Sequence, residues 1–323
     1  MKAIRFHEFG GPEVLKLEDV PDLEAGPGEV LVRVHSSGVN PTDITTRSGR
    51  ANYPSTFAFP AMLGREAAGT VERLGEGVTE RSIGERVLVR GAGFSYAELV
   101  VAPESAVYRL PDGLGMTDAS TVAITYTTAW DAVVNRANVT EGQTVLVQGA
   151  AGGVGVASVQ IAKSLGATVI GTAGSDEKLE WAKGQGLDHG INYSTGEYAS
   201  AVKDLTGGEG VDAVIDGVGG KAFVECFGCL KSGGRVVIYG TAGGREVNFN
   251  LASLFRTRAS VLGSGGTGTS RGDFERILEM LADGTLHATV DRTWPLAEAG
   301  EAQRYVEERR VRGKVALVVA EAI

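Results

Sequence analysis

Residues Thr144–Gly155 read TVLVQGAAGGVG, and this stretch decides the fold. Thr144–Gly149 is an aliphatic, β-branched run typical of a buried strand, and Gly153–Leu165 follows with apolar residues at helical spacing. Glycines between a strand and a helix let the backbone approach a phosphate, and the start of the helix offers free N–H groups and the positive end of its dipole. The context predicts a nucleotide-binding turn, with a tight turn that holds no ligand as the plain alternative.

The same alternation of strand and helix continues after the turn. Strands are expected at Ala167–Thr172, Gly190–Tyr193, Val211–Ile215 and Arg235–Tyr239, with helices at Asp176–Lys183 and Lys221–Leu230. Strands and helices that alternate at this interval form βαβ units and a parallel sheet. We therefore expect an α/β chain whose central part, residues 123–264, is a doubly wound nucleotide-binding domain.

The two ends of the chain have a different character. Short β runs separated by glycine turns dominate the first third, at Leu31–His35, Arg86–Val89 and Ala97–Val101. The tail has one helix pattern, Asp273–Leu281, and a final apolar run, Lys314–Val319. Because the tail is short, we expect it to join the first lobe, which gives a second domain made of residues 1–122 and 265–323.

The end of the second expected strand bears on the choice of cofactor. NAD sites place an acid there for the ribose 2′-hydroxyl, whereas NADP sites use small and basic residues. This chain has Ser175 at that position and Lys178 one helical turn later, a pair suited to a 2′-phosphate. Ser175 is also a good N-cap, and both roles are compatible. The prediction is NADPH.

Composition excludes several classes of function. The 323 residues carry a formal charge of −9, which argues against a basic surface for nucleic acid or anionic lipid. No apolar run is long enough to span a membrane, and two cysteines are too few for a disulfide framework. Cys226 and Cys229 lie inside a helical pattern, where packing explains them better than redox chemistry or zinc binding. A cytoplasmic enzyme is expected.

Several ordered motifs show a family resemblance that runs nearly end to end. They are Gly38–Asp43 (GVNPTD), Leu63–Val71 (LGREAAGTV), Gly84–Val87 (GERV), Thr128–Trp130 (TAW), the AAGGVG turn and Ile191–Tyr193 (INY). In these the chain resembles the zinc-independent, zeta-crystallin-like quinone oxidoreductase branch of the medium-chain dehydrogenase/reductase superfamily. The resemblance implies a GroES-like β-rich catalytic domain, built from both termini, around a central Rossmann domain.

The resemblance also implies that no metal is bound. Zinc enzymes of the superfamily carry a cysteine in the context of Asn40 and a histidine in the context of Arg65, and both ligands are missing here. Without zinc as a Lewis acid, hydride transfer favours an acceptor that spreads its charge, such as a quinone or an alkene conjugated to a carbonyl. The protein then has to supply mainly orientation and hydrogen bonds.

The expected site residues follow from the same resemblance. Asn40 should lie near the nicotinamide and the substrate, and Tyr53 should donate a hydrogen bond or proton, unless it only lines a loop. A tyrosine common in the family falls at Thr45, so solvent is the other proton source. The segment Arg47–Pro60 predicts an aromatic substrate slot or local packing. The cofactor residues implied are Asn40, Thr128, Gly152, Gly153, Val154, Ser175, Lys178, Tyr193, Val218, Gly240, Leu262, Ser264 and Lys314.

The resulting hypothesis is an NADPH:quinone reductase that acts on small molecules, with no nucleic-acid or membrane partner. An enoyl or enone reductase and an NADPH-binding protein with little catalysis are the alternatives. Relatives usually pair as dimers, and the β-rich stretch Ala259–Gly263 is a candidate sheet edge for a homodimer.

Overall fold

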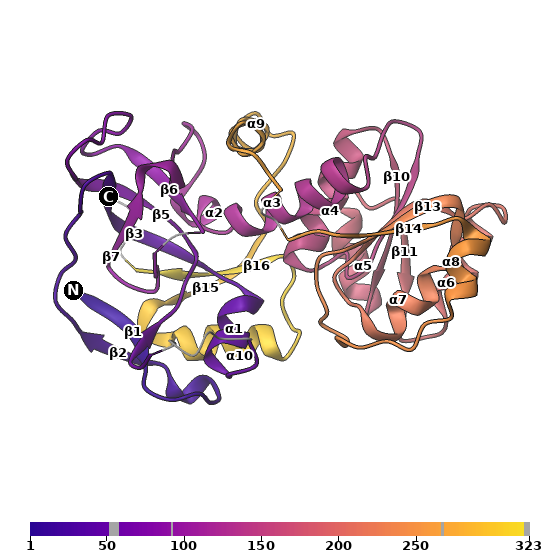
Figure 1. Ribbon diagram of the computed structural model, residues 1–323, viewed down its shortest axis with the longest axis horizontal. Coiled ribbons are helices and arrows are strands. Elements are labelled where there is room, and N and C mark those ends of the chain that lie inside the picture. The colour runs from indigo at the N-terminus through magenta and orange to yellow at the C-terminus, as the bar shows by residue number, and fades with distance from the viewer. Residues whose placement is uncertain (52–57, 92, 266–267, 320–323) are drawn as a thin grey trace. The chain divides into compact units, whose positions relative to one another are not determined.

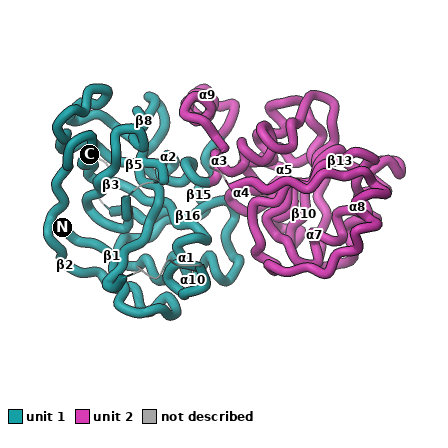
Figure 2. Tube along the Cα trace, viewed as in Figure 1, with its two compact units in different colours: residues 1–124, 287–323 teal, residues 125–286 magenta. Residues whose placement is uncertain are grey.

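The computed structural model describes residues 1–51, 58–91, 93–265 and 268–319. The chain forms two compact units, coloured separately in Figure 2: residues 1–124 with 287–323, and residues 125–286. Helix α3 (Ala123–Trp130) begins in the first unit and continues into the second.

Unit 1 is rich in short strands (Figure 1). Its strands are β1 (Lys2–Phe6), β2 (Lys16–Asp19), β3 (Glu29–Val39), β4 (Ala61–Met62), β5 (Glu66–Leu74), β6 (Arg86–Arg90), β7 (Leu99–Pro103), β8 (Val107–Arg109), β15 (Val290–Pro295) and β16 (Lys314–Val318). Its helices are η1 (Pro12–Val14), α1 (Pro41–Arg47), η2 (Glu104–Ala106), α2 (Met116–Ala119), η4 (Leu296–Glu298) and α10 (Ala299–Glu307).

Strand β3 organises unit 1. It pairs antiparallel with β5, with β7 and with β16, in a sheet of order β15-β16-β3-β5-β6-β8, while β2-β1-β4 form a second sheet. In the register of these pairs, Val315 lies opposite Val39 and Ala67 lies opposite Ser37. Lys314 and Glu66, the residues just before those two partners, are thereby brought to the carboxyl end of β3.

Unit 2 alternates strands and helices. Its strands are β9 (Thr144–Val147), β10 (Thr168–Ala173), β11 (His189–Asn192), β12 (Val211–Asp216), β13 (Leu230–Ile238) and β14 (Ser260–Gly263). Its helices, after α3, are the π-helical segment η3 (Asp131–Arg136), α4 (Gly153–Ser164), α5 (Asp176–Lys183), α6 (Tyr198–Leu205), α7 (Gly220–Cys226), α8 (Leu251–Thr257) and α9 (Arg271–Ala282).

The six strands of unit 2 form one parallel sheet of order β11-β10-β9-β12-β13-β14. This is the doubly wound order: from β9 successive strands are added in one direction to β11, and from β12 they are added in the other direction to β14. Helices α4 and α5 lie on one side of the strands, and α6, α7 and α8 lie on the other (Figure 1). Buried residues of α6 and α7 pack with Leu146, Ile170, Val214 and Val236 of the sheet in one apolar core. The predicted fold class is confirmed.

One segment joins a different unit from the one expected. Residues 265–286, including α9, belong to unit 2 rather than to the β-rich lobe. The Thr269 hydroxyl donates to Thr127 O at 2.7 Å, and Asn135 Nδ2 donates to Gly268 O at 3.1 Å. These long-range bonds hold the segment against the start of unit 2, and no local sequence pattern predicts them.

The two cysteines are buried in unit 2 as free thiols. Each Sγ donates to a carbonyl three residues earlier, Cys226 to Phe223 O and Cys229 to Cys226 O. Burial raises the pKa of both thiols, so neither forms a nucleophilic thiolate near neutral pH. Their environment agrees with the packing role.

Among the helices of the described residues, none has the length and apolar character needed to cross a membrane.

Candidate active site

The glycine turn of unit 2 joins β9 to α4 in a conformation that requires glycine. Gly149 adopts a φ of +66°, and a Cβ on Gly155 would lie 2.1 Å from Gly149 O, so both positions require glycine. Gly152, the N-cap of α4, has no side chain that could accept a hydrogen bond from the N–H groups of the first turn. Gly152, Gly153 and Val154 are all partly exposed, so the start of α4 is accessible to a phosphate.

The predicted 2′-phosphate residues meet at the ends of β10 and β11. Ser175 caps α5, with its Oγ accepting from Lys178 N at 3.3 Å. Tyr193 is 47% exposed, and its hydroxyl lies so close to Gly174 that a Cβ there would be 2.8 Å from it. Asp176, the nearest acid, accepts from Asn192 Nδ2 at 2.8 Å. The structure thus groups Ser175, Lys178 and Tyr193 around one turn.

The remaining cofactor residues of unit 2 follow the other strands. Val218 comes after β12, Gly240 comes after β13, Leu262 lies in β14 and Ser264 follows it. Because the strands are parallel, their carboxyl ends share one edge of the sheet with the glycine turn. A Cβ on Gly240 would lie 2.8 Å from Gly217 O, so glycine lets β12 and β13 end close together. Thr128 lies on α3 and is partly exposed.

Two residues of unit 2 have structural tasks that the sequence did not reveal. The Ser264 hydroxyl is buried and donates to Asp131 Oδ2 at 2.6 Å, and the Ser264 N–H donates to Ile238 O at 2.8 Å. Asp216 accepts through Oδ1 from Val218 N at 2.7 Å and Gly219 N at 3.0 Å, and so shapes the turn after β12. Burial raises the pKa of Asp216. The sequence offered one signal for this role of Asp216: it is an acid at the end of a strand, directly before a glycine.

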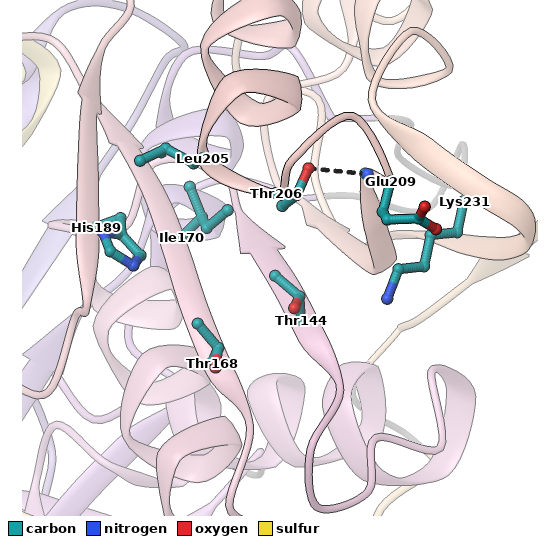
Figure 3. Close-up of a pocket in the computed structure, with 9 residues that line it drawn as sticks. Thr144, Thr168, Ile170, His189, Leu205, Thr206, Glu209 and Lys231 are labelled. Atoms are coloured by element: carbon teal, nitrogen blue, oxygen red, sulfur yellow. Dashed lines mark hydrogen bonds between the residues drawn. The ribbon is translucent and has the colours of Figure 1, made fainter.

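A cavity of about 180 Å³ lies at the opposite edge of the same sheet (Figure 3). It is lined by Thr144 and Thr168, which begin β9 and β10, and by His189 and Lys231. Lys231 is paired with Asp212 at 3.1 Å. The cavity lies at the amino ends of these strands, so it is separated from the predicted cofactor residues at their carboxyl ends.

In unit 1, Asn40 and Lys314 come together at the carboxyl end of β3. Asn40 is 1% exposed and Lys314 is 6% exposed. The Lys314 ammonium donates to Val39 O at 2.6 Å, to Asn40 Oδ1 at 2.7 Å and to Glu66 Oε1 at 3.0 Å. These three acceptors match the three hydrogens of an ammonium group. Lys314 is therefore enclosed by the protein itself.

Sequence reasoning missed Glu66, which completes this cluster. The Glu66 side chain is fully buried, and its Oε1 accepts from Asn40 Nδ2 at 2.8 Å as well as from Lys314. Its Oε2 accepts from Ile124 N, in the first turn of α3, at 2.9 Å. The sequence signal was an acid at the first position of β5, directly before Ala67 and Ala68.

Asp43 and Tyr96 extend the buried network. Asp43 Oδ2 accepts from Asn40 N at 2.8 Å and from the Tyr96 hydroxyl at 3.1 Å. Burial raises the pKa of Asp43 to about 6, against the lowering effect of these bonds and of Lys314. Burial also raises the pKa of Tyr96 well above its usual range.

The predicted substrate loop is only partly described. Tyr53 and Phe57 lie outside the described residues. Phe59 packs edge-on against Phe6 and Phe9, with ring centroids 5.6 Å and 4.9 Å away, so local packing accounts for part of its surface. Thr45 donates to Thr42 O at 3.0 Å.

The residues at the end of β3 do not fit a metal cation. Asn40 Oδ1 and Glu66 Oε1 already accept from an ammonium, which would repel a metal ion there. Arg65 is exposed and donates to Gly91 O at 3.4 Å. Within the described ranges, no group of three or more His, Cys, Asp and Glu side chains could hold a metal ion.

Comparison with known proteins agrees with this architecture. Residues 26–112 match the alcohol dehydrogenase GroES-like domain, and residues 153–283 match the zinc-binding dehydrogenase family. The quinone oxidoreductase of Rattus norvegicus is 34% identical over 91% of this chain and 87% of its own length. The chain belongs to the medium-chain dehydrogenase/reductase superfamily, in its zeta-crystallin-like quinone oxidoreductase branch.

Two further similarities concern this branch. A 2-haloacrylate reductase from a Burkholderia species is 34% identical to this chain, over 98% of each chain. The crystal structure of Escherichia coli quinone oxidoreductase complexed with NADPH superposes with a TM-score of 0.92 at 28% identity, covering 99% of this chain and 100% of that chain. The family and the GroES-like and Rossmann architecture predicted from sequence are confirmed.

Proposed function

We propose that this medium-chain reductase transfers hydride from NADPH to a quinone without a metal ion. The observation that carries the proposal is the set of donors at the end of β3. There the Lys314 ammonium donates to the Asn40 amide, and these two groups occupy the place where a zinc enzyme would bind its metal ion. Such groups orient and hydrogen-bond but provide no Lewis acid, which suits an acceptor that delocalises the charge it receives. The rat and E. coli relatives carry the name quinone oxidoreductase.

The fit to NADPH rests on unit 2. The start of α4 offers backbone N–H groups for the pyrophosphate, and Gly155 keeps the turn tight enough for that approach. Ser175, Lys178 and Tyr193 surround the expected place of the 2′-phosphate, where an acid would repel it.

The other residues assigned to the cofactor groove complete this proposal. They are Thr128, Gly152, Gly153, Val154, Val218, Gly240, Leu262 and Ser264. Bound NADPH supplies the hydride from its nicotinamide ring.

Unit 1 would act at the reacting end. Asn40 has one amide hydrogen on Glu66 and the other directed at Gly38 O, 3.5 Å from Nδ2, a contact weak enough to exchange for a ligand. Lys314 acts on the ligand through Asn40, because its own hydrogens are taken. A quinone needs one proton besides the hydride, and solvent or Tyr53 would supply it.

An activated alkene is the second candidate acceptor. The 2-haloacrylate reductase relative supports it, because its named substrate is an alkene conjugated to a carboxyl group. Hydride addition to such an alkene also leaves a delocalised enolate, so the same donor set serves both reactions. A third possibility is that the protein binds NADPH with little catalysis.

The experiment compares acceptors directly. NADPH oxidation is followed with 1,4-benzoquinone, with a simple enone and with an acyl-CoA enone, at equal enzyme concentration. The proposal expects the fastest turnover with the quinone, whereas faster turnover with either enone selects the second candidate. Tight NADPH binding with no turnover of any acceptor would leave only the binding protein.

We also propose that two copies pair through the open edge of the unit 2 sheet. Strand β14 ends the strand order, and its Val261 is 41% exposed. On the preceding helix, α8, Leu251 and Phe255 are each 71% exposed and lie one turn apart. An open strand edge next to apolar side chains is a surface that a second copy of the chain would cover.

The cytoplasm remains our proposed compartment. Both cysteines are buried free thiols, which suits a reducing environment.

A further inference from the structure

Glu66 is the common point of three segments that are distant in the sequence. Its carboxylate receives Lys314 from β16, Asn40 from the end of β3 and the Ile124 N–H from α3. Gly38 makes room for it, because a Cβ there would lie 2.5 Å from Glu66 Oε1 and 2.4 Å from Ser120 O. A fully buried carboxylate with donors on both oxygens is held in one orientation.

The cluster also fixes which way the Asn40 amide points. Lys314 donates to Oδ1, and Nδ2 donates to Glu66. If the amide turned over, Nδ2 would face the ammonium and Oδ1 would face the carboxylate, and both contacts would be repulsive. The charged pair therefore selects the orientation in which Asn40 keeps a donor hydrogen for exchange.

We propose that Glu66 is a positioning residue for hydride transfer, which orients the Asn40 amide and the Lys314 ammonium and anchors the first turn of α3. This inference rests on the proposed function, because it gives Asn40 its place beside the reacting ring. Glu66 itself touches neither cofactor nor substrate in this scheme.

In Glu66→Gln the side chain keeps its shape, but it cannot accept hydrogen bonds from both Lys314 and the Ile124 N–H. With its oxygen toward Lys314, its NH₂ faces the Ile124 N–H; with its oxygen toward Ile124, its NH₂ faces the ammonium. Glu66→Gln should therefore lower kcat about 10-fold or more at saturating NADPH. The dissociation constant for NADPH should change less than kcat, because the phosphate residues in unit 2 are intact.

The matched control is Glu85→Gln. Glu85 is another largely buried acid of unit 1, paired with Arg81 at 3.0 Å, and it lies outside the proposed site. This variant should keep wild-type kcat. The emission spectrum of bound NADPH, recorded without any acceptor, should change in Glu66→Gln and not in Glu85→Gln.

A double variant separates positioning from stability. In Lys314→Met, Asn40 still donates to Glu66, so its orientation is kept while a buried carboxylate loses its counter-charge. Adding Glu66→Gln removes that charge and lets Gln at 66 accept from Ile124 and donate to a reversed Asn40 amide. The double variant should thus melt at a higher temperature than Lys314→Met but have a lower kcat.

The outcomes distinguish the two proposals. A kcat for Glu66→Gln within about twofold of wild type, with unchanged NADPH emission, overturns the role of Glu66 and leaves the reductase function standing. A double variant whose kcat rises together with its melting temperature shows a purely structural role. If the wild type reduces no acceptor, the reductase function fails and the role of Glu66 in hydride transfer fails with it; a changed emission of bound NADPH in Glu66→Gln then shows only that Glu66 orients Asn40 beside the nucleotide.

Discussion

The buried polar residues at the end of β3 carry a cost that their contacts must offset. Removing an ion pair from water costs several kcal/mol per ion, and this is recovered only when the geometry is good and further hydrogen bonds satisfy the two charged groups. Lys314 and Glu66 meet that condition, with all three ammonium hydrogens and both carboxylate oxygens engaged. Because burying these charges costs free energy, the cluster is better explained by a need to orient the Asn40 amide at a site than by a gain in stability.

Lys178 gives a test of cofactor choice. Lys178→Ala should weaken NADPH about 10-fold or more, because a charge-assisted bond to a phosphate contributes about 1.5–3 kcal/mol. NADH affinity should hardly change, since NADH lacks the 2′-phosphate. Fluorescence titration with each nucleotide measures both. Lys183→Ala, in the last turn of the same helix, is the control; an equal loss for NADPH and NADH in Lys178→Ala would contradict the phosphate role.

Asp43 gives a test of pH dependence. Its pKa is raised from 3.8 to about 6, so the folded protein binds this proton more tightly than the unfolded chain. The resulting stabilisation is complete below pH 3.8 and is lost as the pH rises through about 6. The stability of wild type relative to Asp43→Asn should therefore fall between pH 4 and pH 7, by up to about 3 kcal/mol. Urea unfolding across this range measures it, and a difference that does not vary with pH would refute it.

At the scale of elements, the β9–α4 junction depends on one close contact. The Cβ of an alanine at 155 would lie 2.1 Å from Gly149 O, so α4 would have to move away from the turn. We expect Gly155→Ala to weaken NADPH binding about 10-fold or more and to lower the melting temperature. Calorimetry with and without NADPH measures both effects.

The control for this element is Gly272→Ala in α9. A Cβ at Gly272 would meet nothing within 4 Å, and alanine favours a helix over glycine by about 1 kcal/mol. This variant should be as stable as wild type or slightly more so and should bind NADPH normally. Unchanged NADPH binding in Gly155→Ala would mean that the turn tolerates the shift and does not form the phosphate site.

At the scale of the whole molecule, the proposed pairing of two copies through the open edge of the unit 2 sheet can be tested by the oligomeric state. Phe255→Glu combined with Val261→Lys places charges on the apolar helix and the edge strand and should give a monomer. Light scattering coupled to size-exclusion chromatography measures the mass. Ile83→Glu, at a residue of unit 1 that is 70% exposed, is the matched control and should stay dimeric. A monomeric wild type, or a dimer that survives both changes, would refute the proposal.

The architecture was predictable because its signals are local. The β9–glycine–α4 junction and helix α5 (Asp176–Lys183) were readable from spacing and turn residues alone. Ser175 and Lys178 are three positions apart, so their meeting in the first turn of α5 follows from helix geometry. The family resemblance, which rests on short motifs in a fixed order, added the two-domain organisation and Asn40.

The long-range contacts were not predictable in this way. Glu66 was missed because its partner Lys314 lies 248 positions away. The use of the Ser264 hydroxyl by Asp131, 133 positions earlier, was hidden for the same reason. The assignment of residues 265–286 also depended on such contacts, since Thr269 bonds to Thr127 across 142 positions.

The sequence by itself therefore determined the fold, the glycine turn between β9 and α4 and the family, because strand and helix periodicity and glycine turns are properties of neighbouring residues. Only the tertiary structure decided that Lys314, Asn40 and Glu66 form one closed cluster. The register of β16 and β5 on β3 brings them together, and that register is chosen by the packing of the whole sheet rather than by any local pattern.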